Sequence, residues 1–184
     1  VDMPIQHASD KILKAMGRRT NNAELRNIIS KLRKEIPDIC LRTTLITGFP
    51  GETEEDHQIL LDFIDEMEFD RLGVFTYSPE EDTKAASLDN QVDEEVKLCR
   101  KDEIMELQQE ISMDKSERLV GKEIEVIIEG KASDEDVYVG RSYMDAPSVD
   151  GYVFINSEEE LMSGDFAKVR IVKAMEYDLI GDLI

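Results

Sequence analysis

The sequence is poor in cysteine and has no long hydrophobic run. Only Cys40 and Cys99 are present among 184 residues. Two widely separated cysteines cannot build a disulfide framework or a clustered metal site, so we expect a reducing, cytoplasmic compartment and no metal ligands in this chain. No apolar stretch approaches the length of a membrane span, and the start lacks the charged and apolar regions of a signal peptide, so we expect no membrane association.

Positive charge is also scarce. The chain has 42 Asp and Glu against 22 Lys and Arg, a formal net charge of -20. Phosphate binding needs concentrated Lys and Arg, so this balance argues against a broad nucleic-acid-binding face and against tRNA as a partner. An acidic surface favours a basic partner, although many proteins are acidic merely for solubility.

The most informative stretch is residues 41–56, LRTTLITGFPGETEED. A short apolar strand ends in a glycine-containing turn, and a helix with an acidic start follows at once. Because strand residues alternate, Arg42, Thr44, Ile46 and Gly48 share one face, and the glycine lets backbone approach a ligand closely. The polar, narrow face predicts a lined pocket. An ordinary loop followed by a surface helix explains the pattern equally well.

Strand and helix signals alternate through residues 1–118, which predicts an α/β domain. The expected strands are 2–6, 39–47 and 71–77, and the expected helices are 9–18, 21–36, one that begins after Thr53, and 93–116. The last helix should bury a stripe made of Val96, Cys99, Ile104, Leu107 and Ile111.

That stripe makes Cys99 a small core hydrophobe. His57 stands on the acidic helix and should lie at the surface. Phe75 should pack in the core.

Beyond residue 118 the pattern changes to short strands with turn signals and no helix. Five strands are expected, at 122–129, 137–142, 151–155, 166–172 and 177–183. Five strands in so short a stretch predict a small β-barrel. Residues 120–184 hold 15 acidic and 6 basic side chains, a net charge of -9.

Three segments resemble the radical SAM methylthiotransferase family: DMPIQHASDKILKAMGRR, LRTTLITGFPGETEED and FDRLGVFTYSPEEDT. In that family a partial (β/α) barrel binds S-adenosylmethionine and a [4Fe-4S] cluster, and a TRAM domain, a small five-stranded β-barrel, follows it. The resemblance therefore implies an α/β plus all-β fold. Residues 1–118 would be the second half of the radical SAM barrel with a trailing helix, and residues 119–184 the TRAM domain.

Within the family the chain is most similar to the RimO branch, which methylthiolates the β-carbon of an aspartate in the small-subunit ribosomal protein S-twelve. Gln6-His7 stands where MiaB-like members usually carry Ser-Gly, and residues 107–112 and 141–151 resemble RimO signatures. A tRNA-binding TRAM domain should be basic, whereas this one is acidic. Two alternatives stay open, a MiaB-like tRNA-adenosine methylthiotransferase and a non-catalytic protein-binding module of translation.

The family's CxxxCxxC motif, and the three further cysteines of its N-terminal domain, have no counterpart here. The resemblance thus implies two [4Fe-4S] clusters in the full-length protein, with ligands outside this chain, and an inactive fragment. The strand-like start at Val1 also indicates a piece of something longer. If earlier barrel strands are absent, residues 2–6 should form an unpaired sheet edge.

The resemblance also implies binding residues, while it identifies no catalytic residue. The expected contacts to S-adenosylmethionine are Gln6, Arg42, Thr44, Ile46, Gly48 and Tyr77. Arg42 would pair with a carboxylate of the cofactor, with a buried ion pair inside the barrel as the alternative. At Gly48 a side chain would collide with the cofactor, with loop geometry as the alternative.

Two residues are expected to meet the protein substrate. His7 would help to position the target aspartate, and a hydrogen-bonded structural histidine is the alternative. Asp145 would pair with Arg or Lys on the ribosomal protein. Asp150 precedes Gly151, so an Asp-Gly turn is expected there.

Overall fold

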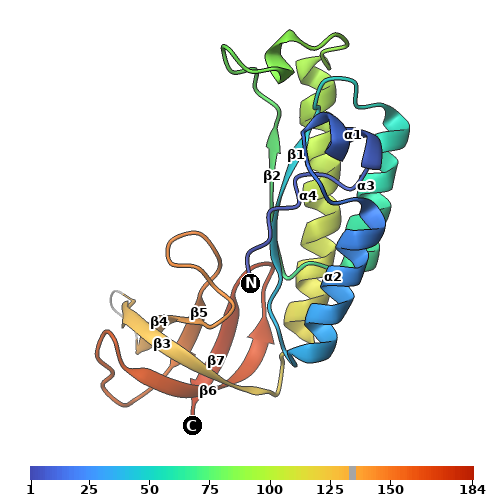
Figure 1. The fold of residues 1–184 in the computed structure, drawn as a ribbon. Helices are drawn as coiled ribbons and strands as arrows, with labels where there is room; N and C mark the ends of the chain where they lie inside the picture. The colour runs from blue at the N-terminus through green and yellow to red at the C-terminus, as the bar shows by residue number, and fades with distance from the viewer. Residues whose placement is uncertain (133–135) are drawn as a thin grey trace. The chain divides into compact units, whose positions relative to one another are not determined.

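The computed structural model describes residues 1–132 and 136–184. The chain divides into two compact units, Val1–Ile111 and Ser112–Ile184 (Figure 1). The division falls inside helix α4 (Glu94–Glu117). A domain boundary between residues 118 and 119, just after that helix, stays a prediction.

The first unit contains two parallel strands, β1 (Arg42–Thr47) and β2 (Arg71–Thr76), paired from Arg42 opposite Arg71 to Thr47 opposite Thr76. Its other elements are α1 (Asp10–Ala15), α2 (Asn22–Glu35), α3 (Glu54–Met67), the short 3-10 helix η1 (Ala85–Ser87) and most of α4.

The expected strand at residues 2–6 is reduced to two isolated parallel bridges, Asp2 with Arg42 and Gln6 with Leu45. Its other side pairs with no strand in the part of the chain that the structure describes. The sheet therefore has the open edge that the sequence predicts.

Helices α2 and α3 begin with the caps that their sequences encode. Asn21 accepts from the Glu24 amide, and Glu24 accepts in return from the Asn21 amide. Thr53 and Asp56 make the same reciprocal pair at the start of α3. Each capping box satisfies two backbone donors that a helix start leaves unpaired. The two helix starts were predicted correctly.

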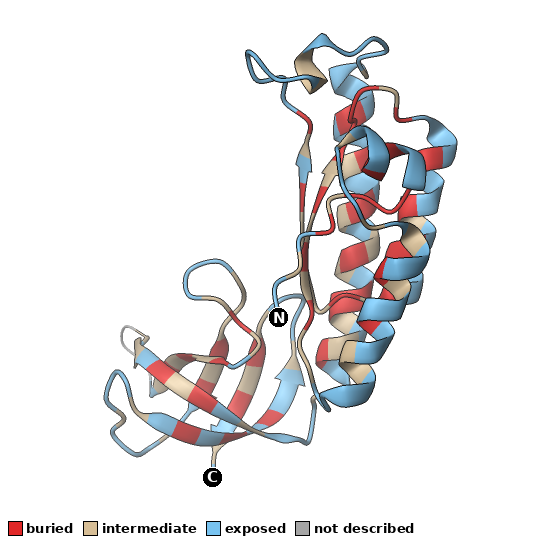
Figure 2. Ribbon diagram, viewed as in Figure 1, coloured by how far each residue is buried: buried red, intermediate tan, exposed pale blue. Residues whose placement is uncertain are grey.

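One face of the β1–β2 sheet is covered by helices. Thr43, Leu45 and Thr47 alternate as the buried residues of β1. Helices α2, α3 and α4 lie on this side of the two strands, and their buried residues form bands along them (Figures 1 and 2). The core between helices and sheet includes Leu25, Ile29, Leu41, Leu45, Leu60, Phe63, Ile64, Phe69 and Ile104. This packing orients the other face of β1, which carries the candidate site.

Helix α4 buries a different stripe from the one predicted. Ile104 and Ile111 are buried as expected, but Val96 and Cys99 are exposed. Lys97 and Arg100 take their place and are only 5% and 6% exposed. Lys97 and Arg100 are buried because they donate to buried oxygen atoms, the Tyr77 carbonyl and the Glu52 carboxylate.

Two further burial predictions were wrong. His57 is 1% exposed rather than at the surface, because α4 packs beside α3 and Glu103 places a carboxylate oxygen 2.7 Å from His57 Nε2. Phe75 is 62% exposed rather than in the core, because it lies on the sheet face that the helices leave uncovered.

The second unit is a closed five-stranded barrel in the order β3-β4-β5-β7-β6. The strands are β3 (Glu123–Lys131), β4 (Val137–Ser142), β5 (Val153–Asn156), β6 (Phe166–Ala174) and β7 (Leu179–Leu183). β5 and β7 pair in parallel and all other neighbours are antiparallel. The predicted small barrel of five strands is confirmed.

The β4–β5 loop closes tightly against the β6–β7 turn. A Cβ atom on Gly151 would lie 1.9 Å from the carbonyl oxygen of Tyr177, so only glycine fits there. Asp150 is half-buried, and its Oδ2 accepts from the Ala146 amide at 2.7 Å. Close approach of two backbones, rather than a positive φ, therefore explains the Asp-Gly pair.

None of the helices among the described residues is long and apolar enough to cross a membrane.

Candidate cofactor-binding site

The face of the sheet opposite the helices combines polar and apolar side chains. Arg42, Thr44 and Ile46 of β1 are half-buried there. Their register partners in β2 are Arg71, Gly73 and Phe75. The face thus changes along the strands from two arginines at the start to an isoleucine and an exposed phenylalanine at the end. An elongated ligand with a charged part and an apolar part matches this gradient.

A small apolar cluster lies where the two strands end. Ile12, Phe49 and Tyr77 are buried in it, with Ile46 packed alongside. The rings of Phe49 and Tyr77 meet edge to face with centroids 5.2 Å apart. The Tyr77 hydroxyl is buried and has no hydrogen-bond partner among the described residues. A buried hydroxyl left unpaired is costly, so this position fits a ligand that brings a polar atom.

Gly48 turns the chain at the end of β1 in a left-handed conformation, with φ +74°. A Cβ atom there would lie 2.2 Å from Cγ of Lys97. Backbone geometry and the lysine side chain therefore both require glycine at this position. Gly51 has φ +81° with open space around it, so loop geometry alone accounts for that residue.

Glu52 organises the turn and was not singled out from the sequence. Its side chain is fully buried. Oε2 accepts from the amides of Gly48 at 2.7 Å and Phe49 at 3.1 Å, and Oε1 lies 3.0 Å from Arg100 Nη1. Burial alone would raise the pKa of this carboxyl, but the His7 imidazole, the Arg100 charge and the Phe49 amide together hold the pKa below its ordinary value.

His7 lies behind this turn, with no exposed surface. Its Nδ1 accepts from the Ser9 amide at 2.9 Å, which assigns the proton of the neutral ring to Nε2. Nε2 lies 3.6 Å from Oε2 of Glu52. Full burial and the hydrogen bond at Nδ1 favour a structural histidine, whereas Nε2 has no hydrogen-bond partner among the described residues. A direct contact of His7 with the substrate stays a prediction.

Gln6 lies directly beside β1. Its amide donates to the Thr44 carbonyl at 3.0 Å, and its carbonyl accepts from the Ile46 amide at 2.8 Å. Its φ of +71° is rare outside glycine, which marks a backbone held by its surroundings.

The structure thus brings Gln6, Thr44 and Ile46 together, and Gly48 and Tyr77 close the same end of the sheet. Arg42 stands at the opposite end of β1, about 20 Å from Gly48 at the usual rise per strand residue.

Asp145, the other expected substrate contact, belongs to the second unit. It is 7% exposed, and its Oδ2 accepts from the Ser142 hydroxyl at 2.7 Å. This bond shapes the β4–β5 loop. A role in substrate binding stays a prediction.

Among the described residues, no group of three or more His, Cys, Asp or Glu side chains is placed to hold a metal ion. Cys40 precedes β1, and Cys99 is exposed on α4. The Cys99 Sγ donates to Glu103 Oε1 at 3.6 Å, and this bond and the carboxylate charge raise the pKa of the thiol. A raised pKa disfavours the thiolate that metals bind. The described residues therefore do not fit an iron-sulfur cluster.

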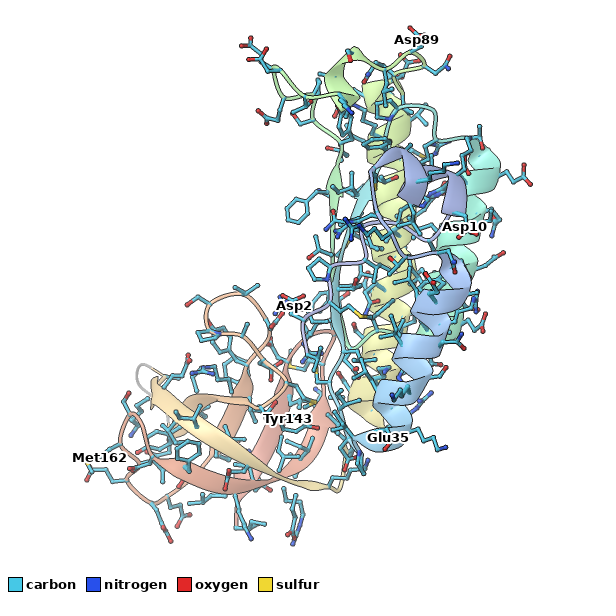
Figure 3. All side chains as sticks on the ribbon, viewed as in Figure 1. Asp2, Asp10, Glu35, Asp89, Tyr143 and Met162 are labelled. Carbon is cyan, nitrogen blue, oxygen red and sulfur yellow. The ribbon has the colours of Figure 1, made fainter. Side chains whose placement is uncertain are left out.

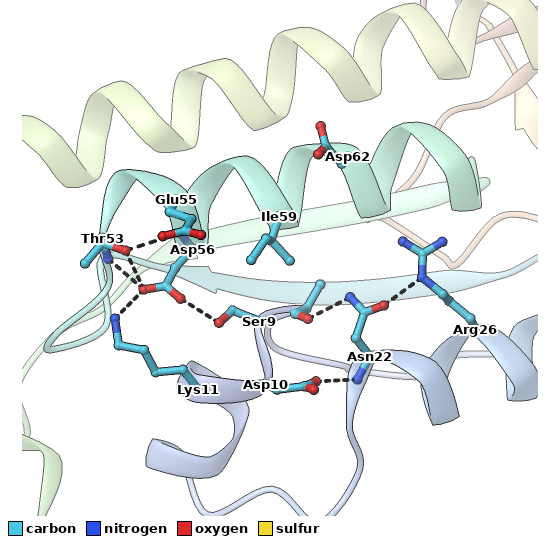
Figure 4. A pocket seen from close by; sticks show the side chains of 11 residues that line it. Ser9, Asp10, Lys11, Asn22, Arg26, Thr53, Glu55, Asp56, Ile59 and Asp62 are labelled. Carbon is cyan, nitrogen blue, oxygen red and sulfur yellow. Dashed lines mark hydrogen bonds and ion pairs between the residues drawn. The ribbon is translucent and has the colours of Figure 1, made fainter.

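A separate pocket of about 650 Å³ opens between α1, α2 and α3 (Figure 4). Asp56 spans its wall: Oδ1 accepts from Ser9 Oγ at 2.6 Å, and Oδ2 accepts from Lys11 Nζ at 2.6 Å and from Thr53. Burial raises the pKa of Asp56, but the bonds from Lys11, Ser9 and Thr53 outweigh it and hold the pKa far below its ordinary value. The pocket contains none of the expected cofactor contacts, and its polar groups tie α1 to α3.

Residues 1–64 match the model of the radical SAM superfamily, and residues 120–184 match that of the TRAM domain. A "Ribosomal protein uS12 methylthiotransferase RimO" of Lachnoclostridium phytofermentans is 60% identical over 181 residues, which are 98% of this chain and 41% of the relative. The proteins of that name from Acetivibrio thermocellus and Clostridioides difficile are both 51% identical, over all of this chain and 41% of their own length. The chain matches the C-terminal part of the RimO methylthiotransferases.

This match confirms the expected fold class, part of a radical SAM domain followed by a TRAM domain. The chain spans about two-fifths of the length of these RimO relatives. Glu52, Lys97 and Arg100 were missed in the sequence. Positions 97, 100, 104, 108 and 111 are all buried and repeat at helical spacing, but only Ile104 and Ile111 are apolar, so the hydrophobic pattern did not indicate this face.

Proposed function

We propose that this chain is the second half of the radical SAM barrel and the TRAM domain of an enzyme that methylthiolates the β-carbon of an aspartate in ribosomal protein uS12. The observation that carries the proposal is 60% identity, over nearly the whole chain, to a relative named for uS12 methylthiotransfer. When bound, S-adenosylmethionine and its iron-sulfur cluster supply the radical chemistry. The residues of this chain would bind and orient the cofactor and keep water out of the site.

We place the S-adenosylmethionine site on the face of the β1–β2 sheet opposite the helices, the open face, which carries Arg42, Thr44 and Ile46 of β1 and their partners in β2. Ile46 and the exposed ring of Phe75 would cover the apolar part of the adenosyl group, and the unpartnered Tyr77 hydroxyl would bond a polar atom. Gln6, Thr44 and Gly48 would offer backbone and hydroxyl contacts beside them. Arg42, at the start of β1, would reach only the far end of an extended cofactor.

The full-length enzyme would carry two [4Fe-4S] clusters with all ligands outside this chain. Cys40 precedes β1 and Cys99 is exposed on α4, and the described residues include no group of three or more His, Cys, Asp or Glu placed to hold a metal, which supports this assignment. By itself the fragment would therefore be inactive.

The proposed partner is the ribosomal protein itself, which would place the reaction in the cytoplasm. The TRAM region's net charge of -9 suits a basic protein better than a polyanion. Exposed acids also line the loop between β2 and α4, where Asp89 projects outward (Figure 3). Asp145 and His7 keep their proposed roles near the substrate.

The test is mass spectrometry of cells that lack the full-length gene, following the methylthio group on the uS12 aspartate and on tRNA adenosine. Loss from uS12 alone is the expected result. Loss from tRNA alone would assign the MiaB-like activity, and loss from neither would favour a non-catalytic module. Returning the full-length gene should restore the mark, whereas returning residues 1–184 alone should not.

A further inference from the structure

Lys97 of α4 is a buried cation at the end of the sheet. It is 5% exposed, and its Nζ donates to the carbonyl oxygen of Tyr77 at 2.9 Å and to Glu94 Oε2 at 3.1 Å. Nζ also lies over the Tyr77 ring, 5.6 Å from its centroid. Lysine is almost never buried without specific partners, so these contacts need an explanation.

The stem of the same lysine packs on Gly48. A Cβ atom at Gly48 would lie 2.2 Å from Lys97 Cγ and 2.9 Å from Cδ. Gly48 follows the last residue of β1, and Tyr77 follows the last residue of β2. One side chain therefore contacts the carboxyl ends of both strands.

Arg100 lies one helical turn after Lys97 in α4 and contacts the other end of the loop at residues 48–52. Its Nη1 lies 3.0 Å from Glu52 Oε1 and 3.3 Å from the Glu52 carbonyl oxygen. Glu52 in turn accepts from the amides of Gly48 and Phe49. The two cations thus fix residues 48–52 and Tyr77 from a helix that contributes no residue to the open face.

We propose that Lys97 and Arg100 are positioning residues for cofactor binding, which rests on the proposed function above. They hold the GFPGE turn and Tyr77 so that the end of the open face is formed before S-adenosylmethionine arrives. A preformed site avoids the entropy cost of ordering a loop during binding. Neither residue touches the cofactor, and each acts through Gly48, Glu52 or Tyr77.

The experiment uses the full-length protein with Lys97→Met, which keeps an apolar stem over Gly48 and removes the ammonium. Amide hydrogen exchange of Gly48 and Phe49 should accelerate about tenfold or more, and the dissociation constant for S-adenosylmethionine, from equilibrium dialysis, should rise about tenfold. Lys101→Met, a change on the same helix at a half-buried position, is the matched control and should alter neither value.

Arg100→Met should weaken binding in the same way, and Arg100→Lys, which keeps a cation near Glu52, should recover part of the affinity. A merely structural role predicts a lower melting temperature with an unchanged dissociation constant in the folded protein, and that result would overturn the proposal. If Lys97→Met fails to fold, Arg100→Lys against wild type is judged by the same two measurements.

The two proposals can fail separately. A wild-type protein that does not bind S-adenosylmethionine overturns the proposed function and with it the role toward the cofactor. If the wild-type protein binds S-adenosylmethionine, but Lys97→Met changes neither the dissociation constant nor the amide hydrogen exchange of Gly48 and Phe49, only the positioning role is overturned.

Discussion

Arg100 and Glu52 form a buried ion pair, with Arg100 Nη1 3.0 Å from Glu52 Oε1 and both side chains at most 7% exposed. On its outer side the same guanidinium reaches Glu54, whose side chain is 82% exposed, at 3.3 Å. One arginine therefore bonds a buried and an exposed carboxylate. A buried charge that loses its partner is strongly destabilising, whereas an exposed pair contributes little.

Glu52→Gln should lower the free energy of unfolding by about 3 kcal/mol, because Arg100 would lose its buried counter-charge and keep only the exposed Glu54. Glu54→Gln is the control and should change the free energy by less than about 0.5 kcal/mol. Urea denaturation followed by circular dichroism gives both values. Equal losses in the two variants would contradict this assignment.

Asp56 should make stability depend on pH in acid. The pKa of its carboxyl is depressed in the folded protein, so the unfolded chain binds more protons and the free energy of unfolding falls as the pH drops below about 5. Asp56→Asn should be less stable than wild type at neutral pH, and the difference should shrink as the solution is acidified.

Urea denaturation over this pH range measures that difference. Asp62→Asn, an exposed change on the same helix, should leave the acid dependence unaltered. A gap between Asp56→Asn and wild type that stays constant with pH would show that Asp56 acts by packing and not by charge.

Gly151→Ala should destabilise the barrel by about 1–3 kcal/mol, because the new methyl would overlap the Tyr177 carbonyl and force two backbones apart. Gly130→Ala is the matched control, since nothing lies within 4 Å of a Cβ atom there. Thermal melting of both variants tests the prediction, which fails if they melt together.

Phe75→Ala should weaken binding of S-adenosylmethionine to the full-length protein about tenfold, since it removes an aromatic contact on the open face. Its free energy of unfolding should change little, because Phe75 is 62% exposed. Phe166→Ala removes a phenylalanine that is 70% exposed in the barrel and should leave the affinity unchanged. Equal affinities in all three proteins would remove Phe75 from the site.

Local chemistry explains why the helix starts and the barrel strands were predictable. The capping boxes at Asn21 and Thr53 involve residues three positions apart, so the sequence encodes them directly. The alternation that places Arg42, Thr44 and Ile46 on one face is also a property of the strand alone.

The start of α4 shows where such local reasoning fails. Both the stripe through Val96 and Cys99 and the stripe through Lys97 and Arg100 have helical spacing, and hydrophobicity favours the first. The second stripe is buried because Lys97 donates to the Tyr77 carbonyl, 20 residues away in the chain, and Arg100 pairs with Glu52, 48 residues away. No count of apolar residues within the helix contains that information.

The sequence by itself determined the order of the elements, the helix caps, the five-stranded barrel and the family resemblance, because each depends on residues near one another in the chain. Only the tertiary structure decided that His57 is buried, that Phe75 faces outward and that two cations of α4 hold the turn after β1. Those outcomes depend on which faces meet, and the free energy of burying a charge or a ring is set by partners that folding brings from distant positions.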